Sequence, residues 1–362
     1  MNLKSEIEKL YGKEIYNHSS QLNDWVGWYK GYVEDFHNYE VPKGAGEKKK
    51  VRRLSMGMGK AIGENYANLL VNEKTDVVLE NEQDNELLNK ILNNLLFWTK
   101  ENEGVEKEYA LGSSASVIQI ETSVNANTGE LVVEDDSNIH YEIIDATRVY
   151  PLSWRYGEVE ECGFVSFGSK EGNIVLHVKD ENGNYDIKNY TYRRENTNSE
   201  WKLIKEESTV FKTNSKVKLF SYMKPNVANN IEFDNPSGVS IYANAIDTMK
   251  SVDAIYDGYY YEFILGKKRV FASASLTMIN EDGQMVRTFD ENDLGVYVLP
   301  TDDDGKNKLN FEEGSLRADA YSRALNDYLS LLSYQVGFGK DFFSFGGEVA
   351  RLTNHCSKFG FI

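Results

Sequence analysis

Residues 236–271, PSGVSIYANAIDTMKSVDAIYDGYYYEFILGKKRVF, predict one long helix. Asn235, Pro236 and Ser237 are typical of a helix start, because they offer a capping side chain and a proline in the first turn. Apolar side chains then recur every three or four residues as one stripe, formed by Ile241, Ala245, Met249, Val252, Tyr256, Tyr259 and Phe263. From Gly238 to Leu265 this helix would be about 40 Å long, which suggests packing on a second long helix or on copies of itself.

A second helix is predicted by SLRADAYSRALNDYLSLLSYQVG, residues 315–337, which ends at Gly337. Its apolar face carries Tyr321, Leu325, Tyr328 and Leu332. The segment between the two helices consists of short strand and turn patterns, among them GVYVLP and the acidic loop TDDDGKNK. The sequence therefore predicts two helices side by side, joined at one end by a small β-rich module.

The residues before this pair predict an α+β region. Up to Gly112 the apolar spacing is helical, and Trp25, Trp28 and Tyr32 are predicted to form a buried aromatic stripe. A loop is predicted over residues 41–53 and a helix break at Gly104. After Gly112 the period changes to two, which indicates short antiparallel strands. DENGNYD, residues 180–186, is a strong hairpin signal.

Composition restricts the class of protein. The net charge is −17, which disfavours a protein that binds nucleic acid phosphates tightly over its surface. It does not disfavour a protein through which DNA passes without being bound. The N-terminus has no apolar core of the kind that secretion signals carry, and no apolar run is long enough for a membrane span. Two cysteines far apart in sequence give neither a disulfide framework nor a metal spacing.

Motifs for catalysis and cofactor binding are not found. SMGMGKAIG resembles a phosphate-binding loop, but Leu54 and Ala61 occupy positions that need glycine and serine or threonine. The five histidines lack zinc spacing, and no nucleophile elbow occurs. We therefore expect no enzyme, no cofactor and no metal. Three alternatives stay open: a carbohydrate-active enzyme, suggested by the Tyr, Trp and Asp content, an acidic interaction protein and a nucleic-acid-binding regulator.

The opening stretch also resembles a known family. NPSGVSIYANAIDTMKSVDAIYDGYYYEFILGKKRVF is similar to the signature of portal proteins from tailed phages of Gram-positive bacteria. Further segments fit the family in the same order: AIGENYANLLVNEK, EKEYALGSSASVIQI, ATRVYPLSWRYGEVEECGFVS and LNDYLSLLSYQVGFGKDFFSF. The similarity extends over nearly the whole chain, to about Gly347.

The resemblance implies a structural role in phage, prophage or virion assembly. Portal subunits form a ring, usually a dodecamer, at one capsid vertex, and double-stranded DNA is packaged and ejected through it. The implied partners are further copies of the chain, the DNA, the terminase large subunit, a head-completion or adaptor protein, and the major capsid and scaffolding proteins. The implied location is the virion, and the host cytoplasm during assembly, with no membrane partner.

The family architecture divides the chain into regions. The resemblance implies a wing at 1–235, a first stem helix at 236–266, a clip at 267–312, a second stem helix at 313–337 and the start of a tunnel-loop region at 338–362. From about residue 348 the sequence, RLTNHCSKFGFI included, departs from the family pattern, and the crown is missing. We expect a frameshift or truncation, and impaired or altered oligomerisation that light scattering would detect.

Two groups of residues are candidates for contact with DNA. If the polar face of the first stem helix lines a channel, its wall includes Asp247, Lys250 and Asp257. Their charge is mostly negative, so it repels phosphates and lets DNA slide. The alternative is that they face solvent or form salt bridges between subunits. The basic run Lys267, Lys268 and Arg269 lies where stem meets clip. It could contact phosphates or pair with the acids at 302–304 of another subunit.

Overall fold

The computed structural model describes residues 2–16, 21–44, 47–120, 123–124, 131–132, 139–233, 235–265, 269–273, 278–279, 285–286, 295–299, 309–312 and 316–345. The chain divides into two compact units. Unit 1 consists of Met1–Glu34 and Gly57–Asn244, and unit 2 of Asp35–Met56 and Ala245–Ile362. The mixture of helix and sheet agrees with the predicted α+β class.

Two antiparallel sheets form the framework of unit 1. The five-stranded sheet, in the order β11-β10-β9-β8-β7, consists of β7 (Val149–Arg155), β8 (Glu158–Phe167), β9 (Glu171–Lys179), β10 (Tyr185–Arg193) and β11 (Lys202–Lys212). The three-stranded sheet consists of β12 (Phe220–Met223), β3 (Ser114–Ile120) and β6 (Ile139–Asp145), and β4 (Ser123–Val124) pairs with β5 (Leu131–Val132). The predicted turn between β9 and β10 is confirmed, with Gly183 at φ 82°.

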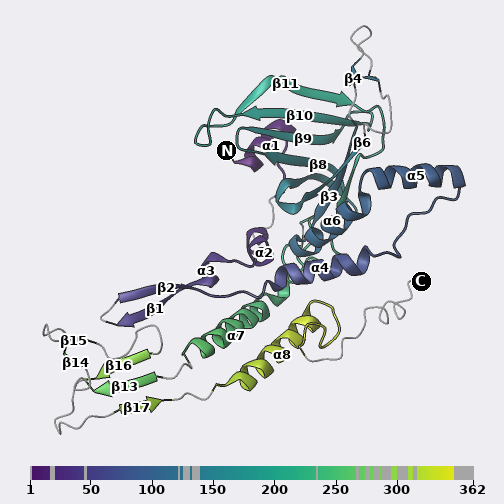
Figure 1. The fold of residues 1–362 in the computed structure, drawn as a ribbon. Helices are drawn as coiled ribbons and strands as arrows, with labels where there is room; N and C mark the ends of the chain where they lie inside the picture. The colour runs from purple at the N-terminus through teal and green to yellow at the C-terminus, as the bar shows by residue number, and fades with distance from the viewer. Residues whose placement is uncertain are drawn as a thin grey trace. The chain divides into compact units, whose positions relative to one another are not determined.

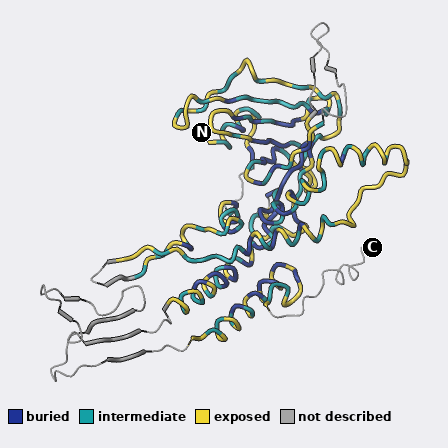
Figure 2. The backbone as a smooth tube through the Cα atoms, in the orientation of Figure 1, coloured by how far each residue is buried: buried dark blue, intermediate teal, exposed yellow. Residues whose placement is uncertain are grey.

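The five-stranded sheet has an apolar core on each face. Successive side chains point to opposite faces, so β9 directs Ile174 and Leu176 to one side, where they pack with Ile7 of α1 (Leu3–Tyr11). On the other side Phe164 packs with Phe220 of the three-stranded sheet. Figure 1 shows α1 across one face of the sheet, and Figure 2 shows buried positions along strands of both sheets.

The described part of unit 1 also contains the helices α2 (Leu22–Tyr29), α4 (Met58–Leu70), α5 (Glu82–Asn94) and α6 (Phe97–Leu111). A short 3-10 helix, η2 (Ala146–Arg148), connects β6 and β7. Trp25 and Trp28 are buried as predicted, whereas Tyr32 is partly exposed. The predicted break at Gly104 is wrong: the chain turns at Leu96, with φ 51°, and Gly104 lies inside α6, where it allows close contact with Ile143.

The predicted start of the long helix is also wrong. Helix α7 (Ile246–Leu265) begins ten residues after Pro236, preceded by the 3-10 helix η3 (Ala243–Ala245), and its 20 residues span about 30 Å. Residues 236–242 are instead held by unit 1, since Ile241 N–H donates to Tyr109 O at 2.9 Å and Tyr242 Oη donates to Trp25 O at 2.8 Å. These tertiary contacts override the local helix signal.

Unit 2 contains the two predicted helices and a hairpin that was predicted as a loop. The short helix α3 (Glu34–His37) leads into β1 (Asn38–Gly44), which pairs antiparallel with β2 (Glu47–Arg52). Helix α8 (Ala318–Gln335) falls within the predicted 313–337. Between the helices, β13 (Arg269–Ser273) pairs with β16 (Gly295–Leu299) and β17 (Leu309–Glu312), and β14 (Met278–Ile279) pairs with β15 (Met285–Val286).

Candidate functional site

Two buried aspartates of α7 hold the segment around the β1-β2 hairpin. Asp253, 2 % exposed, accepts a hydrogen bond from Met56 N–H at 2.8 Å, and its other oxygen lies 3.1 Å from His37 Nε2. One turn later Asp257 accepts bonds from Leu54 N–H at 3.0 Å and from Tyr39 Oη at 3.2 Å. Both carboxylates thus use their two oxygens within unit 2, and we call these residues the aspartate clamp.

The surroundings of the clamp are aromatic and cationic. Arg53 lies over the ring of Phe36, 4.2 Å from its centroid, and donates from Nη1 to Phe36 O. Burial, with the charge of Asp257 next, raises the pKa of Tyr39 to about 12. Tyr39 therefore keeps its proton at neutral pH and serves as a donor to the carboxylate.

The three predicted channel residues lie in two different environments. The side chain of Asp247 is 95 % exposed and forms an ion pair at 3.0 Å with Lys250, one turn away on α7. Asp257, in contrast, is 5 % exposed and belongs to the clamp. Of these three residues, Asp247 and Lys250 present charge to solvent, whereas Asp257 does not.

The basic run at the end of α7 lies mostly outside the described residues. Lys267 and Lys268 are not among them, and Arg269 is the first residue of β13. The backbone of Arg269 is paired with Gly295 on β16 and with Glu312 on β17. The prediction that this run contacts DNA stays a prediction.

The C-terminal half of α7 packs on the start of α8. Tyr321 of α8 stacks on Tyr259 with ring centroids 5.6 Å apart, and Gly258 gives its ring room, since an added Cβ would lie 3.1 Å from Tyr321 Cε1. Arg317 donates to both carboxylate oxygens of Glu262, at 3.1 and 2.8 Å. The predicted pairing of the two helices is thus present within unit 2.

Both helices also carry apolar residues that are exposed among the residues that the structure describes. On α7 the buried stripe of Met249 and Val252 continues into an exposed row that consists of Tyr256, Tyr260, Phe263 and Ile264. On α8, Leu325, Leu329 and Leu332 are buried, while the exposed row consists of Tyr328, Leu331 and Tyr334, the last 74 % exposed. Such contiguous apolar surface is typical of protein interfaces.

After α8 the chain folds back onto this helix. Gly337 has φ 85°, and Phe338 stacks on Phe342 with centroids 4.3 Å apart. Phe343 N–H donates to Ser333 Oγ at 3.1 Å, which fixes the returning segment to the buried side of α8. The exposed apolar row of α8 is left uncovered by this turn.

Sequence reasoning missed the hairpin and therefore the clamp. Two signals were available in the sequence: glycines at positions 44 and 46 are typical of a turn, and Asp253 and Asp257 interrupt the apolar flank of α7 four residues apart. Acids at such positions are buried only with partners.

Among the described residues, no cluster of three or more potential metal ligands is found, and no helix is both long and apolar enough to cross a membrane.

Comparison with known protein families gives a match over residues 11–351 to the family described as phage portal protein, SPP1 Gp6-like. The match spans most of the chain, so the chain belongs to this family, whose members are structural components of phage particles. A search of curated proteins found no match. The resemblance inferred from the stretch around α7 is thereby confirmed.

Proposed function

We propose that this chain is a structural subunit of a portal ring, in which copies assemble around a channel for double-stranded DNA. The observation that carries this proposal, beside the family, is the pair of exposed apolar rows on α7 and α8. Full burial of an exposed large apolar side chain contributes about 1.5–3 kcal/mol. The side chains of these rows are 37–74 % exposed, so a neighbouring copy that covers several of them stabilises a ring.

The ring is proposed to be a dodecamer at one vertex of the capsid. This proposal replaces the impaired oligomerisation expected from the departure after about residue 348, because the exposed apolar rows lie on α7 and α8, before that point. Its further partners would be the terminase large subunit during packaging, a head-completion protein afterwards, and the major capsid and scaffolding proteins. In this arrangement α7 and α8 act as the stem, and β13, β16 and β17 belong to the clip. Asp247 and Lys250 are the residues proposed for the channel wall, where an acid and a base side by side give phosphates no strong attachment.

Self-association is the experiment that tests the ring. The variant Tyr260→Ser/Phe263→Ser, which removes two aromatic side chains of the α7 row, should weaken assembly at least tenfold, because about 1.4 kcal/mol already corresponds to that factor. Mass photometry over a concentration series measures the effect. Tyr156→Ser is the control, since Tyr156 is 98 % exposed at the turn between β7 and β8, outside both helices.

The wild-type chain should form oligomers larger than dimers, and the control should match it. A wild-type chain that stays a 41.3 kDa monomer at every concentration would contradict the proposal. Assembly that is equal in the wild type and the double variant would show that the α7 row is not the interface.

The basic run is proposed to contact DNA phosphates at the junction of stem and clip. Replacement of Lys267, Lys268 and Arg269 together by alanine should lower the amount of DNA packaged while rings stay intact. The packaged amount is measured as nuclease-resistant DNA in filled heads. Normal packaging by intact variant rings would show that these residues do not contact DNA. It would favour their pairing with acids of another subunit.

A further inference from the structure

The segment between α4 and α5 exposes three apolar residues in a row. Val77, Val78 and Leu79 are 42 %, 71 % and 42 % exposed, and residues 75–79 form no helix, strand or turn. Figure 1 shows this segment as a long connection that runs in an extended course from α4 to α5. A run of three exposed apolar residues is unusual on a protein surface unless it binds a partner.

The backbone of this segment has one edge free for strand pairing. Val77 N–H donates to Asp76 Oδ1 at 2.8 Å, and Leu79 N–H donates to Asn85 Oδ1 at 3.0 Å. In an extended chain, successive residues direct their N–H and C=O groups to opposite edges. The groups of Val78 therefore face the other edge, where no described residue forms a hydrogen bond with them.

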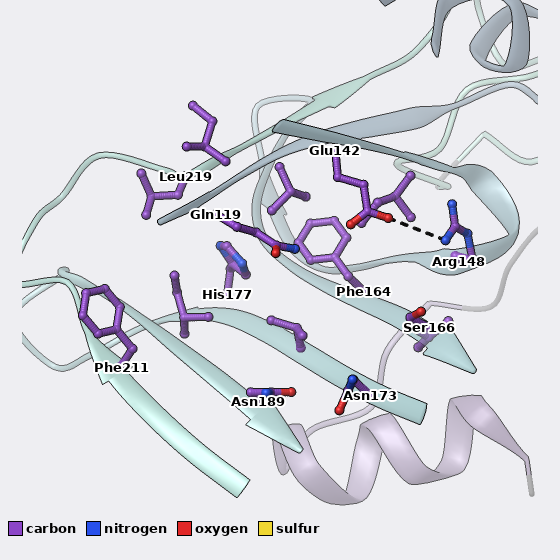
Figure 3. Close-up of a pocket in the computed structure, with 16 residues that line it drawn as sticks. Gln119, Glu142, Arg148, Phe164, Ser166, Asn173, His177, Asn189, Phe211 and Leu219 are labelled. Atoms are coloured by element: carbon purple, nitrogen blue, oxygen red, sulfur yellow. Dashed lines mark ion pairs between the residues drawn. The ribbon is translucent and has the colours of Figure 1, made fainter. Parts of the chain in front are cut away.

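The charges around the segment are acids without partners. Residues 73–86 contain six acids and one lysine, and the acids are all exposed: Glu73, Asp76, Glu80, Glu82, Asp84 and Glu86. None of them forms an ion pair with another described residue. In contrast, the pocket of about 470 Å³ between the two sheets of unit 1 is lined by charges that pair with each other, Glu142 and Arg148 at 3.8 Å (Figure 3). The acids around Val78 thus favour a basic partner from outside the chain.

A strand with matching charge is present in unit 2. Residues 48–53, KKKVRR, contain five basic residues and no acid, and most of them belong to β2. Lys49 and Lys50 are exposed and form no ion pair with another described residue. Lys48 pairs with Glu40 of the same hairpin at 3.1 Å, yet its side chain stays 70 % exposed. This basic strand is the complement of the acidic segment.

β2 also has a free edge. Hydrogen-bonded and non-hydrogen-bonded pairs alternate along an antiparallel ladder. Arg53 N–H donates to His37 O, so the next hydrogen-bonded pair along the register is Val51 with Tyr39. The N–H and C=O groups of Lys50, one residue on, therefore point away from β1. In the described part of the chain this sheet consists of β1 and β2, with no third strand at that edge.

We propose that β2 of one copy pairs antiparallel with residues 76–80 of a second copy, with Lys50 opposite Val78. The free edge of each strand then supplies the backbone bonds of the other. This inference deepens the proposed ring, because it names a contact between copies in addition to the rows on α7 and α8.

The register gives each side chain a suitable neighbour. The five pairs are Asp76 with Arg52, Val77 with Val51, Val78 with Lys50, Leu79 with Lys49 and Glu80 with Lys48. Two pairs join opposite charges and one joins two valines, and both kinds stabilise adjacent strands. In the other two pairs, the aliphatic part of a lysine covers an apolar residue while its charge stays in water.

A peptide tests the pairing on the full chain. The acetylated and amidated peptide KKKVRR, residues 48–53, should bind to it. Methylation of the backbone nitrogen that corresponds to Lys50 should raise the dissociation constant at least tenfold. The methyl group removes the N–H that faces Val78 but keeps every charge, so it separates strand pairing from charge attraction. NMR titrations of the chain with each peptide measure both constants.

Variants of the acidic segment test the charge pairs. Asp76→Asn/Glu80→Gln removes two negative charges and keeps the side-chain oxygen that accepts from Val77 N–H. It should weaken binding of the peptide about threefold or more at low salt, because two opposite-charge pairs are lost. Glu181→Gln/Glu195→Gln is the matched control, since it neutralises two exposed acids on other loops of unit 1 and should leave binding within about twofold.

Disulfide trapping tests the contact between copies. Val77→Cys and Val51→Cys are made on separate chains and mixed before assembly, so only a contact between copies can join them. They should form a covalent dimer, because the Cβ atoms of a non-hydrogen-bonded pair lie close together. Val210→Cys replaces Val77→Cys as the control. Val210 is also an exposed valine of unit 1, and its variant should give no dimer above the wild-type background.

The outcomes separate this inference from the ring. Peptide binding that methylation weakens, together with trapping of the dimer, supports the pairing. Peptide binding that methylation leaves unchanged, no peptide binding, or no trapped dimer in assembled chains overturns it. The peptide needs only a single chain, so the pairing can hold for a chain that forms no ring, and rings can form from a chain that does not bind the peptide.

Discussion

At the scale of single residues, Asp253 connects two segments of unit 2 that are far apart in the sequence. Asp253→Ala leaves Met56 N–H and His37 Nε2 without this buried acceptor, so the free energy of unfolding should fall by about 2–4 kcal/mol. Urea denaturation measures the loss. Asp247→Ala is the control on the same helix, and its exposed side chain predicts a change within about 0.5 kcal/mol. Equal effects of the two variants would contradict the role of the clamp.

Glu108 of α6 predicts a pH dependence of stability. Its side chain is buried, and burial, together with the nearby Glu101, raises its pKa to about 7. Because the folded chain holds this proton more tightly than the unfolded chain, the contribution of Glu108 to stability decreases as the pH rises from about 4.5 to 7. Glu108→Gln should therefore be more stable than wild type at pH 8, by about 1–3 kcal/mol.

This advantage should shrink as the pH falls below 7 and vanish near the pKa of an unfolded glutamate. Urea denaturation of both proteins at several pH values measures the difference. Glu103→Gln, an exposed position of the same helix, should show no such trend. A Glu108→Gln advantage that is constant from pH 5 to 8 would show that Glu108 does not titrate as expected.

At the scale of elements, two glycines bring the end of α6 against the segment before α7. Gly112 caps α6 with φ 84°, and a Cβ on Gly238 would run into Gly112 O. Gly238→Ala should therefore lower the free energy of unfolding by about 1–3 kcal/mol, as other overpacked sites do. In Gly339→Ala the added methyl group meets nothing within 4 Å, so its melting temperature should stay close to that of wild type. If the melting temperature of Gly238→Ala is also unchanged, this close approach does not exist.

The same elements show what the sequence could predict and why the rest was missed. Strands β8, β9 and β10 follow from their alternation and from the turn at Gly183, because both signals are local. The start of α7 could not be predicted from local signals. Asn235 and Pro236 are typical of a helix start, but the hydrogen bonds of Ile241 and Tyr242 to other segments of unit 1 keep these residues out of the helix. Asp257 was assigned to a polar face, yet its partners lie about 200 residues away in sequence, and spacing along α7 cannot reveal them.

At the scale of the whole molecule, the proposed function depends on assembly. The family gives the class of protein, and the exposed apolar rows on α7 and α8 are the surfaces that a ring would bury. The net charge of −17 agrees with a channel that repels phosphate, because each duplex carries dense negative charge along its length. Asp247→Lys reverses the charge of an exposed side chain of α7. Assembled rings of this variant should therefore retain more DNA than wild-type rings at low salt, and the difference should disappear at high salt. A DNA-binding assay at the two salt concentrations measures this. Retention equal to wild type would place Asp247 away from the channel.

The most direct test is electron microscopy of the purified full chain at concentrations where it self-associates. The proposed portal ring predicts a closed assembly with a central opening wide enough for a DNA duplex, with α7 and α8 of each copy packed against those of its neighbours. Isolated single chains, or assemblies without a central opening in which the two exposed apolar rows stay uncovered, would contradict it.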